Sequence, residues 1–303
     1  MPTSSPVAPT KTGVSVVRGY LALTKPRVIE LLLVTTVPVM VLAERGLPSL
    51  WLVLATVAGG ALSAGSANTF NMVIDRDIDT VMGRTQTRPL VTGEITPRAA
   101  VIFASTLAAL SFVLLWWLTF LLAALLALAA IAFYVFVYTM WLKRRSEQNI
   151  IWGGIAGCFP VLIGWSAVTG SLSVEPWILF LVVFLWTPPH YWPLSMKYRE
   201  DYESANVPML AVVRDAPVVG MQVILYAWAT VVASLMLIPV APMGVLYSLV
   251  AVVSGGWFIF ESHRLYSRAL AQVEMAPMRV FGSSITYLTL LFLAVGVDPL
   301  LPW

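Results

Sequence analysis

The feature of this chain that most restricts its fold is a series of nine apolar runs, each about as long as a membrane-spanning helix. A helix needs roughly 20 mostly apolar residues to cross the hydrocarbon core of a bilayer. With 59% hydrophobic and 11% charged residues, the chain has more apolar side chains than one water-soluble core can enclose. We therefore predict an all-α integral membrane protein. The predicted spans are 28–43, 51–72, 99–118, 121–142, 150–169, 177–196, 218–240, 244–262 and 281–298.

One of these boundaries is not marked by charge. The third and fourth spans come from a single apolar run, Ala99 to Leu142, that is about twice the length of one span. We place the turn between them near residues 117–119.

The positions of the cations predict the orientation in the membrane. With nine spans, 17 of the 18 lysines and arginines fall on the N-terminal side of the membrane, and only Arg45 falls on the other side. Because cations near span ends stay in the cytoplasm, we expect the N-terminus inside and the C-terminus outside. This inner-face bias also accounts for the net charge of +3 without nucleic-acid binding.

The N-terminal residues 1–22 precede the first span and are predicted to form a disordered cytosolic tail. They begin with small, polar and proline residues, and they lack the features of a signal peptide or an arginine-rich transit peptide. This composition favours a bacterial inner (plasma) membrane over a mitochondrial one.

The first polar segment, residues 71–94, carries three aspartates and three arginines between two apolar spans. Asn71, Asp75 and Asp79 are spaced i, i+4 and i+8, and Asn68 lies on the same helix face. Asp77 points away from that face. Two carboxylates one turn apart at a membrane surface need a positive partner, and Mg²⁺ is commonly held by one or two carboxylates plus substrate phosphates. Arg84 and Arg88, one turn apart if the helix continues, would supply forked donors for phosphate oxygens.

The alternative for this segment is a solvated connector, which is the commoner role of a charged loop in a membrane protein. The aligned spacing of the acids favours the magnesium–diphosphate site. So does the clean start of the next helix, where Thr96 is suited to cap it and Pro97 to occupy its first position.

The second polar segment, residues 190–217, follows the sixth span and contains His190, Lys197 and Arg199. Laid over the first segment at an offset of 119, it brings His190 onto Asn71 and Pro208 onto Pro89. Each segment follows a second helix and precedes a third. This layout predicts two four-helix units plus one extra helix, with both segments at one cytoplasmic mouth of the bundle.

At these motifs the chain resembles the UbiA-like intramembrane prenyltransferases, and within them the haem farnesyltransferase subfamily. The likeness runs from "LTKPRVIELLLVTTVP" through "NTFNMVIDRDID" and "RTQTRPLVTGEITP" to "HYWPLSMKYREDYESANVPML". Superfamily members generally carry a second Asp-x-x-x-Asp motif, where this chain has Lys197-Tyr198-Arg199-Glu200-Asp201. That departure favours one metal site assisted by Lys197 and Arg199 over a two-magnesium site.

The resemblance implies one transmembrane prenyltransferase domain, residues 23–303, with cytoplasmic active-site loops 73–98 and 197–217. Its donor would be farnesyl diphosphate, and its acceptor a vinyl group of haem b (protohaem IX), which would gain water to give haem O. Mg²⁺ would bind Asp75 and Asp79, and a haem-modifying oxygenase is a further candidate partner beside the lipid bilayer. Besides these acids, the implied donor-site residues are Asn68, Asn71, Arg84, Arg88, Lys197, Arg199 and Arg27, the last equally suited to lipid headgroups.

His190 follows Thr187-Pro188-Pro189, where prolines are expected to break helical hydrogen bonding near the mouth. A capping or core histidine is the plain interpretation. The resemblance favours a functional one, in which His190 binds haem iron, hydrogen-bonds a haem propionate or acts as a base for the water step. Tyr134 and Tyr138 are suited to line the prenyl channel or shield the cation, although packing between helices is the commoner role of such residues.

Two other functions stay open. Another UbiA-like enzyme would act on a quinone precursor or other aromatic acceptor, although the absent second Asp-x-x-x-Asp motif argues against it. A secondary transporter would also have helical repeats, but it should place ionisable groups at the bilayer midplane, whereas the charges here lie at one face.

Overall fold

The computed structural model describes residues 13–302, with the side chains of 13–15 and 27–33 left outside the description. All regular structure in this part of the chain is helical. Seven helical segments within it have the length and apolarity of membrane spans. They are α3 (Leu50–Ile74), α5 (Pro97–Leu118), α6 with η1 (Leu121–Ala132 and Phe133–Leu142), α7 with η2 and α8 (Asn149–Gly153, Gly154–Cys158 and Phe159–Thr169), α12 (Ala216–Val240), α13 (Val245–Leu270) and α14 with η3 (Pro277–Val297 and Asp298–Leu300).

Two further long helices, α2 (Pro26–Glu44) and α9 (Val174–Lys197), coincide with the first and sixth predicted spans. The remaining helices are short: α1 (Gly13–Leu23), α4 (Arg76–Val81), α10 (Arg199–Ser204) and α11 (Leu210–Val213). The all-helical prediction is therefore confirmed for residues 13–302, while the membrane crossing of α2 and α9 stays a prediction.

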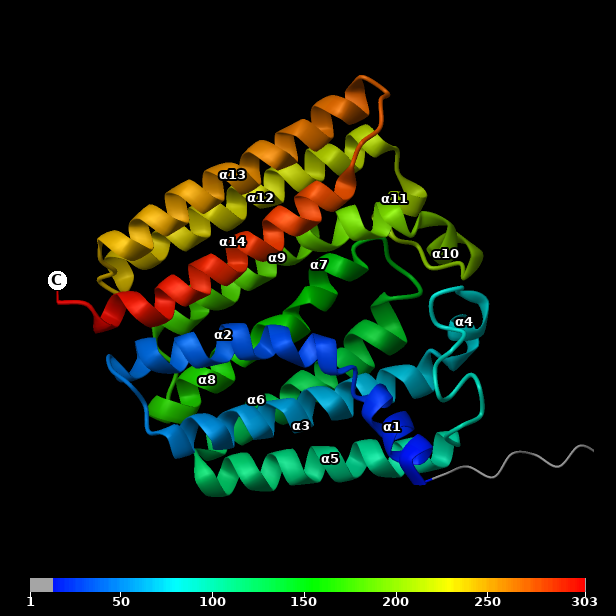
Figure 1. Cartoon of the computed structure of the whole chain (residues 1–303), viewed down its shortest axis with the longest axis horizontal. Coiled ribbons are helices and arrows are strands. Elements are labelled where there is room, and N and C mark those ends of the chain that lie inside the picture. The colour runs from blue at the N-terminus through cyan, green and yellow to red at the C-terminus, as the bar shows by residue number, and fades with distance from the viewer. Residues whose placement is uncertain (1–12, 303) are drawn as a thin grey trace, which may run out of the picture.

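The long helices lie side by side in one bundle (Figure 1). Along one side, α3 packs on α5, α5 on α6, and α6 on α8. Along the other, α9 packs on α12, α12 on α13, and α13 on α14. Helix α2 joins the two sides because it contacts α14, α8 and α3. The short helices α4 and α10 lie together at one end of the bundle, opposite the C-terminus (Figure 1).

Several helix boundaries follow from local chemistry. Thr96 caps α5 by accepting a hydrogen bond from the Ala99 N–H, and Pro97 occupies the first turn as predicted. The turn in the long apolar run falls at residues 119–120, between α5 and α6, next to its predicted position. The close packing of α3 on α5 requires a glycine at residue 59, because a Cβ there would lie 2.5 Å from Leu115 of α5.

The predicted disordered tail is wrong for residues 13–22, which form most of α1; residues 1–12 lie outside the description. Apolar side chains at helical spacing hold α1 in place. Leu23 is fully buried in a cluster with Met72 and Ala100, and the Tyr20 ring meets Phe103 edge-on at 4.9 Å. The prediction of disorder rested on the polar composition of the first ten residues and was wrongly extended to the apolar residues that follow.

The predicted break before His190 is also wrong, because α9 continues through Pro188, Pro189 and Pro193. Each proline removes a helical N–H donor. The helix nevertheless persists because it is packed against α12, α14 and α8, so that tertiary contacts outweigh the lost hydrogen bonds.

Candidate active site

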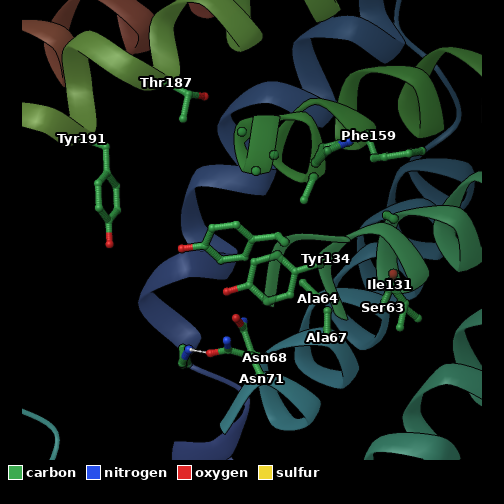
Figure 2. A pocket seen from close by; sticks show the side chains of 18 of the residues that line it. Ser63, Ala64, Ala67, Asn68, Asn71, Ile131, Tyr134, Phe159, Thr187 and Tyr191 are labelled. Carbon is green, nitrogen blue, oxygen red and sulfur yellow. Dashed lines mark hydrogen bonds between the residues drawn. The ribbon is translucent and has the colours of Figure 1, made fainter. Parts of the chain in front are cut away.

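A cavity of about 670 Å³ lies inside the bundle. Its walls come from α2, α3, α6 with η1, η2 with α8, α9 and α14. Figure 2 looks into it, with the α3 residues Ser63, Ala64, Ala67, Asn68 and Asn71 along one wall and Tyr191 across the gap. Most of the lining is apolar or small, whereas one end is charged. The charged and amide residues of that end are Lys25, Asn68, Asn71, Asp79, Arg84, Arg88 and Lys143.

The acids of the first polar segment are held by the junction of α3 and α4. The Asp75 N–H donates to the Asn71 carbonyl and the Asp79 N–H to the Asp75 carbonyl, both at 2.9 Å, so the helical register continues across the junction. Asp75 and Asp79 are 0% and 2% exposed. Asp77, which was predicted to point away from the face of the other two acids, is exposed. It forms a two-pronged ion pair with Arg144 that lowers its pKa to about 2.

The two buried acids have different surroundings. Asp79 lines the cavity and pairs with Arg88. Asp75 lies just outside the lining and reaches it through Asn71, whose amide donates to Asp75 Oδ2 at 2.7 Å. Lys143 binds the same oxygen. Two buried charges in this position require such compensation, because an unpaired buried carboxylate is costly.

The other oxygen of Asp75, Oδ1, is buried without a hydrogen-bond partner. The Arg144 guanidinium stands 3.6 Å from this oxygen, beyond hydrogen-bonding distance. Among the described residues no cluster of three His, Cys, Asp or Glu side chains could form an all-protein metal cage. One orphaned carboxylate oxygen and a second carboxylate one turn away fit Mg²⁺, which usually keeps waters and takes further ligands from a substrate phosphate.

Two lysines at this end of the cavity were not predicted as site residues. Lys25 Nζ donates to Asn71 Oδ1 at 2.8 Å, and its backbone is left-handed, with φ of 51°. Burial, and after it the charges of Arg88 and Lys143, lower the pKa of Lys25 to about 7. Lys143 follows η1 immediately. Neither lysine is near the acids in sequence, so no local pattern could have paired them.

The helix does not continue to Arg84 and Arg88, which was the condition for their one-turn spacing, because α4 ends at Val81 and Met82 is extended. The two arginines nevertheless both line the cavity. Arg84 donates to the Tyr202 hydroxyl at 2.6 Å, and the Gly83 N–H donates to Asp201 Oδ1 at 3.3 Å. The two polar segments therefore meet at one mouth, as the layout of the sequence predicted.

His190 lines the cavity between two aromatic rings, Trp186 at 4.1 Å and Phe281 at 4.6 Å between ring centres. Its Nδ1 lies 2.9 Å from Ser284 Oγ. Because Ser284 donates its own hydrogen to the Phe281 carbonyl, it must accept from His190. The hydrogen-bond network thus assigns the ring proton to Nδ1 and leaves the Nε2 lone pair available.

Other residues lie where the sequence did not lead us to expect. Tyr134 and Tyr138 line the cavity with stacked rings 5.3 Å apart, which agrees with the channel-lining alternative and not with the favoured role in helix packing. Lys197 and Arg199 are exposed and are not among the cavity-lining residues of the described part of the chain. The side chain of Arg27 lies outside the description.

An apolar chamber with buried acids and cations at one end is suited to a molecule with a hydrocarbon tail and a phosphate head. The model of the UbiA prenyltransferase family matches residues 32–296, and the chain belongs to this family. That membership sets aside the transporter alternative.

Curated relatives cover almost the whole chain. It is 66% identical over 286 residues to the protoheme IX farnesyltransferase of Clavibacter michiganensis, with 94% of each chain covered. It is 57% identical to the protein of the same name from Streptomyces avermitilis, again with 94% of each covered.

Two solved structures have the same fold. A digeranylgeranylglyceryl phosphate synthase superposes with a TM-score of 0.75 at 17% identity, covering 94% of this chain and 98% of its own. A UbiA homologue from Archaeoglobus fulgidus bound to DMAPP and Mg²⁺ superposes with a TM-score of 0.69 at 18% identity, covering 92% and 99%.

Proposed function

We propose that this protein transfers the farnesyl group of farnesyl diphosphate to a vinyl group of haem b and that water then adds to give haem O. The observation that carries the donor half is the pair of buried carboxylates, one with an unpartnered oxygen, beside four cations at the charged end of an apolar cavity. The proposed acceptor, haem b, is inferred from the relatives, which are named protoheme IX farnesyltransferases.

The charged end would hold the diphosphate. Asp75 and Asp79 would bind Mg²⁺, which when bound would neutralise charge on the departing pyrophosphate. Arg88, Arg84, Lys25 and Lys143 would contact its remaining oxygens. The amides of Asn68 and Asn71 orient this end, since Asn68 donates to the Thr24 carbonyl at 2.9 Å and Asn71 joins Lys25 to Asp75.

The bond between the first farnesyl carbon and the diphosphate oxygen would break, and its electron pair would leave with pyrophosphate. The π electrons of the haem vinyl group would then form a bond to the allylic cation. A water oxygen would add to the carbon next to the porphyrin ring and release one proton. The enclosed apolar walls would keep water from the allylic cation until the carbon–carbon bond had formed.

His190 would act on the acceptor side. With its proton on Nδ1, the free Nε2 lone pair suits a ligand of haem iron or an acceptor for the proton released by water. The same tautomer makes Nε2 unsuited to donate a hydrogen bond to a haem propionate. Trp186 and Phe281 fix the ring plane in either role.

We further propose that α2 and α9 also cross the membrane, for nine spans in two four-helix units plus one helix, with the N-terminus in the cytoplasm of a bacterial cell. The positive-inside bias of 17 cations supports this orientation. Lys197, Arg199 and Arg27 were predicted to assist at the diphosphate itself. Because Lys197 and Arg199 are exposed and outside the cavity lining, we now propose that these cations attract the diphosphate to the mouth. A haem-modifying oxygenase remains a proposed partner.

The test is transfer of labelled farnesyl from its diphosphate to haem b by membranes containing this chain, with Mg²⁺ or with a chelator. We expect a haem product of the mass of haem O that depends on Mg²⁺. Transfer of label to a quinone precursor but not to haem b would contradict the proposed acceptor. Undiminished transfer by a variant with both Asp75→Asn and Asp79→Asn would contradict the proposed donor site.

A further inference from the structure

One face of α3 lines the cavity from its charged end to its apolar depth. Residues that line the cavity recur at every turn of this helix, among them Val57, Gly60, Ala64, Asn68 and Asn71. One helical turn rises about 5.4 Å, which is close to the length of one extended isoprene unit. The successive turns of α3 therefore divide the cavity into steps of nearly one isoprene unit each.

The neighbouring glycines on this helix differ in what surrounds them. A Cβ added to Gly59 would lie 2.5 Å from Leu115 Cγ, so this glycine serves the packing of α3 on α5. A Cβ added to Gly60 would meet no heavy atom within 4 Å, and Gly60 lines the cavity. Packing between helices therefore does not require a glycine at residue 60. The absence of a side chain there leaves free volume inside the cavity.

We infer that Gly60 determines which prenyl chain length the enzyme accepts, by leaving space for the third isoprene unit. This inference rests on the proposed function, in which the diphosphate lies next to Asn71. Gly60 precedes Asn71 by eleven residues, or about 16 Å of helix, which is three isoprene steps. Ala64 borders the second step and Gly60 the third, at which a farnesyl chain would end. Val57 stands one turn beyond that end.

The experiment measures binding of unreactive thiolodiphosphate analogues to the purified full-length protein in detergent with Mg²⁺, by calorimetry. The probes carry dimethylallyl, geranyl and farnesyl chains. Gly60→Leu should weaken binding of the farnesyl analogue by tenfold or more while leaving the geranyl analogue within twofold. Ala64→Leu should weaken both of these and spare the dimethylallyl analogue. Gly256→Leu is the matched control, because this exposed glycine of α13 also has open space and lies outside the cavity lining.

An unchanged ratio of farnesyl to geranyl affinity in Gly60→Leu would overturn the inference. So would equal effects of Gly60→Leu and Ala64→Leu on all three probes. Gly60→Val provides a smaller change with the same expected direction if the leucine variant does not fold. Binding of these analogues needs no acceptor, so it is measured independently of farnesyl transfer to haem. If the substitutions at residue 60 change the chain-length preference as expected but the protein does not farnesylate haem, only the proposed acceptor is contradicted.

Discussion

The two polar segments lie at the same mouth, yet they contribute in opposite ways. The first segment buries its key charges, Asp75 and Asp79, and pairs each of them with a cation. The second segment leaves Lys197 and Arg199 exposed and sends its rings inward, with His190 and Tyr191 in the cavity lining.

This difference teaches that charge in a sequence does not by itself locate a site. A buried carboxylate is retained only where partners or a ligand compensate its desolvation, whereas an exposed lysine costs little anywhere on a surface. The proposed diphosphate end of the cavity and its proposed acceptor side thus come from two segments of similar polarity. Four predictions test this division, taken from the largest expected effect to the smallest.

Asp75→Asn or Asp79→Asn should reduce farnesyl transfer roughly 1,000-fold, the upper range for losing one electrostatic contact to a transition state. Asp77→Asn, the exposed neighbour, should stay within about threefold. Initial rates with labelled farnesyl diphosphate measure all three, and unfolding midpoints establish that the variants are folded. Equal losses at residues 75 and 77 would remove the distinction between buried and exposed acids.

His190→Ala should reduce transfer roughly 100-fold, within the range for loss of a general acid or base. It should also alter the visible spectrum of bound haem while leaving binding of a farnesyl diphosphate analogue unchanged. His263→Ala is the control, because the other histidine of the chain is exposed and bonded to Trp228 at 3.1 Å. Weaker diphosphate binding in His190→Ala would instead assign this residue to the donor half.

Lys25 should make diphosphate binding depend on pH. Its pKa is lowered to about 7, so the free protein loses this positive charge as pH rises, and an anion then binds less well. Binding of the farnesyl analogue should be about tenfold weaker at pH 8 than at pH 6. Lys25→Arg, charged throughout this range, should remove that dependence. The comparison of the two proteins cancels titration of the ligand itself, and identical pH profiles would contradict the role of Lys25.

Lys197→Ala should have the smallest effect, a loss of about threefold or less in the apparent second-order rate constant, as expected for an exposed cation that only attracts the substrate. Added salt should abolish the difference. Lys143→Ala should be more damaging at every salt concentration, because Lys143 is bonded to a fully buried acid. A salt-independent loss in Lys197→Ala would mean that this lysine contacts the diphosphate directly.

Much of this site could be predicted from local sequence. The i, i+4, i+8 spacing placed Asn71, Asp75 and Asp79 in one helical register, and the Thr96-Pro97 pair marked the start of α5. Local signals failed where distant packing decides the outcome. The prolines of α9 predicted a break in the helix, but packing against neighbouring helices keeps it continuous. The helix α1 was missed because its apolar residues follow a polar N-terminal segment.

The sequence alone determined that the chain is helical, that it needs lipid as solvent and that two polar segments lie between its apolar runs. It could do so because the length of an apolar run and the spacing of residues on a helix are local properties. Only the tertiary structure decided which side chains compensate the buried acids. Lys25 lies 46 residues from Asn71 and Lys143 lies 68 residues from Asp75, and no periodicity connects residues so far apart. Likewise, the tautomer of His190 depends on Ser284 and the free volume beside Gly60 on the surrounding helices, since both arise from packing between elements that are remote in sequence.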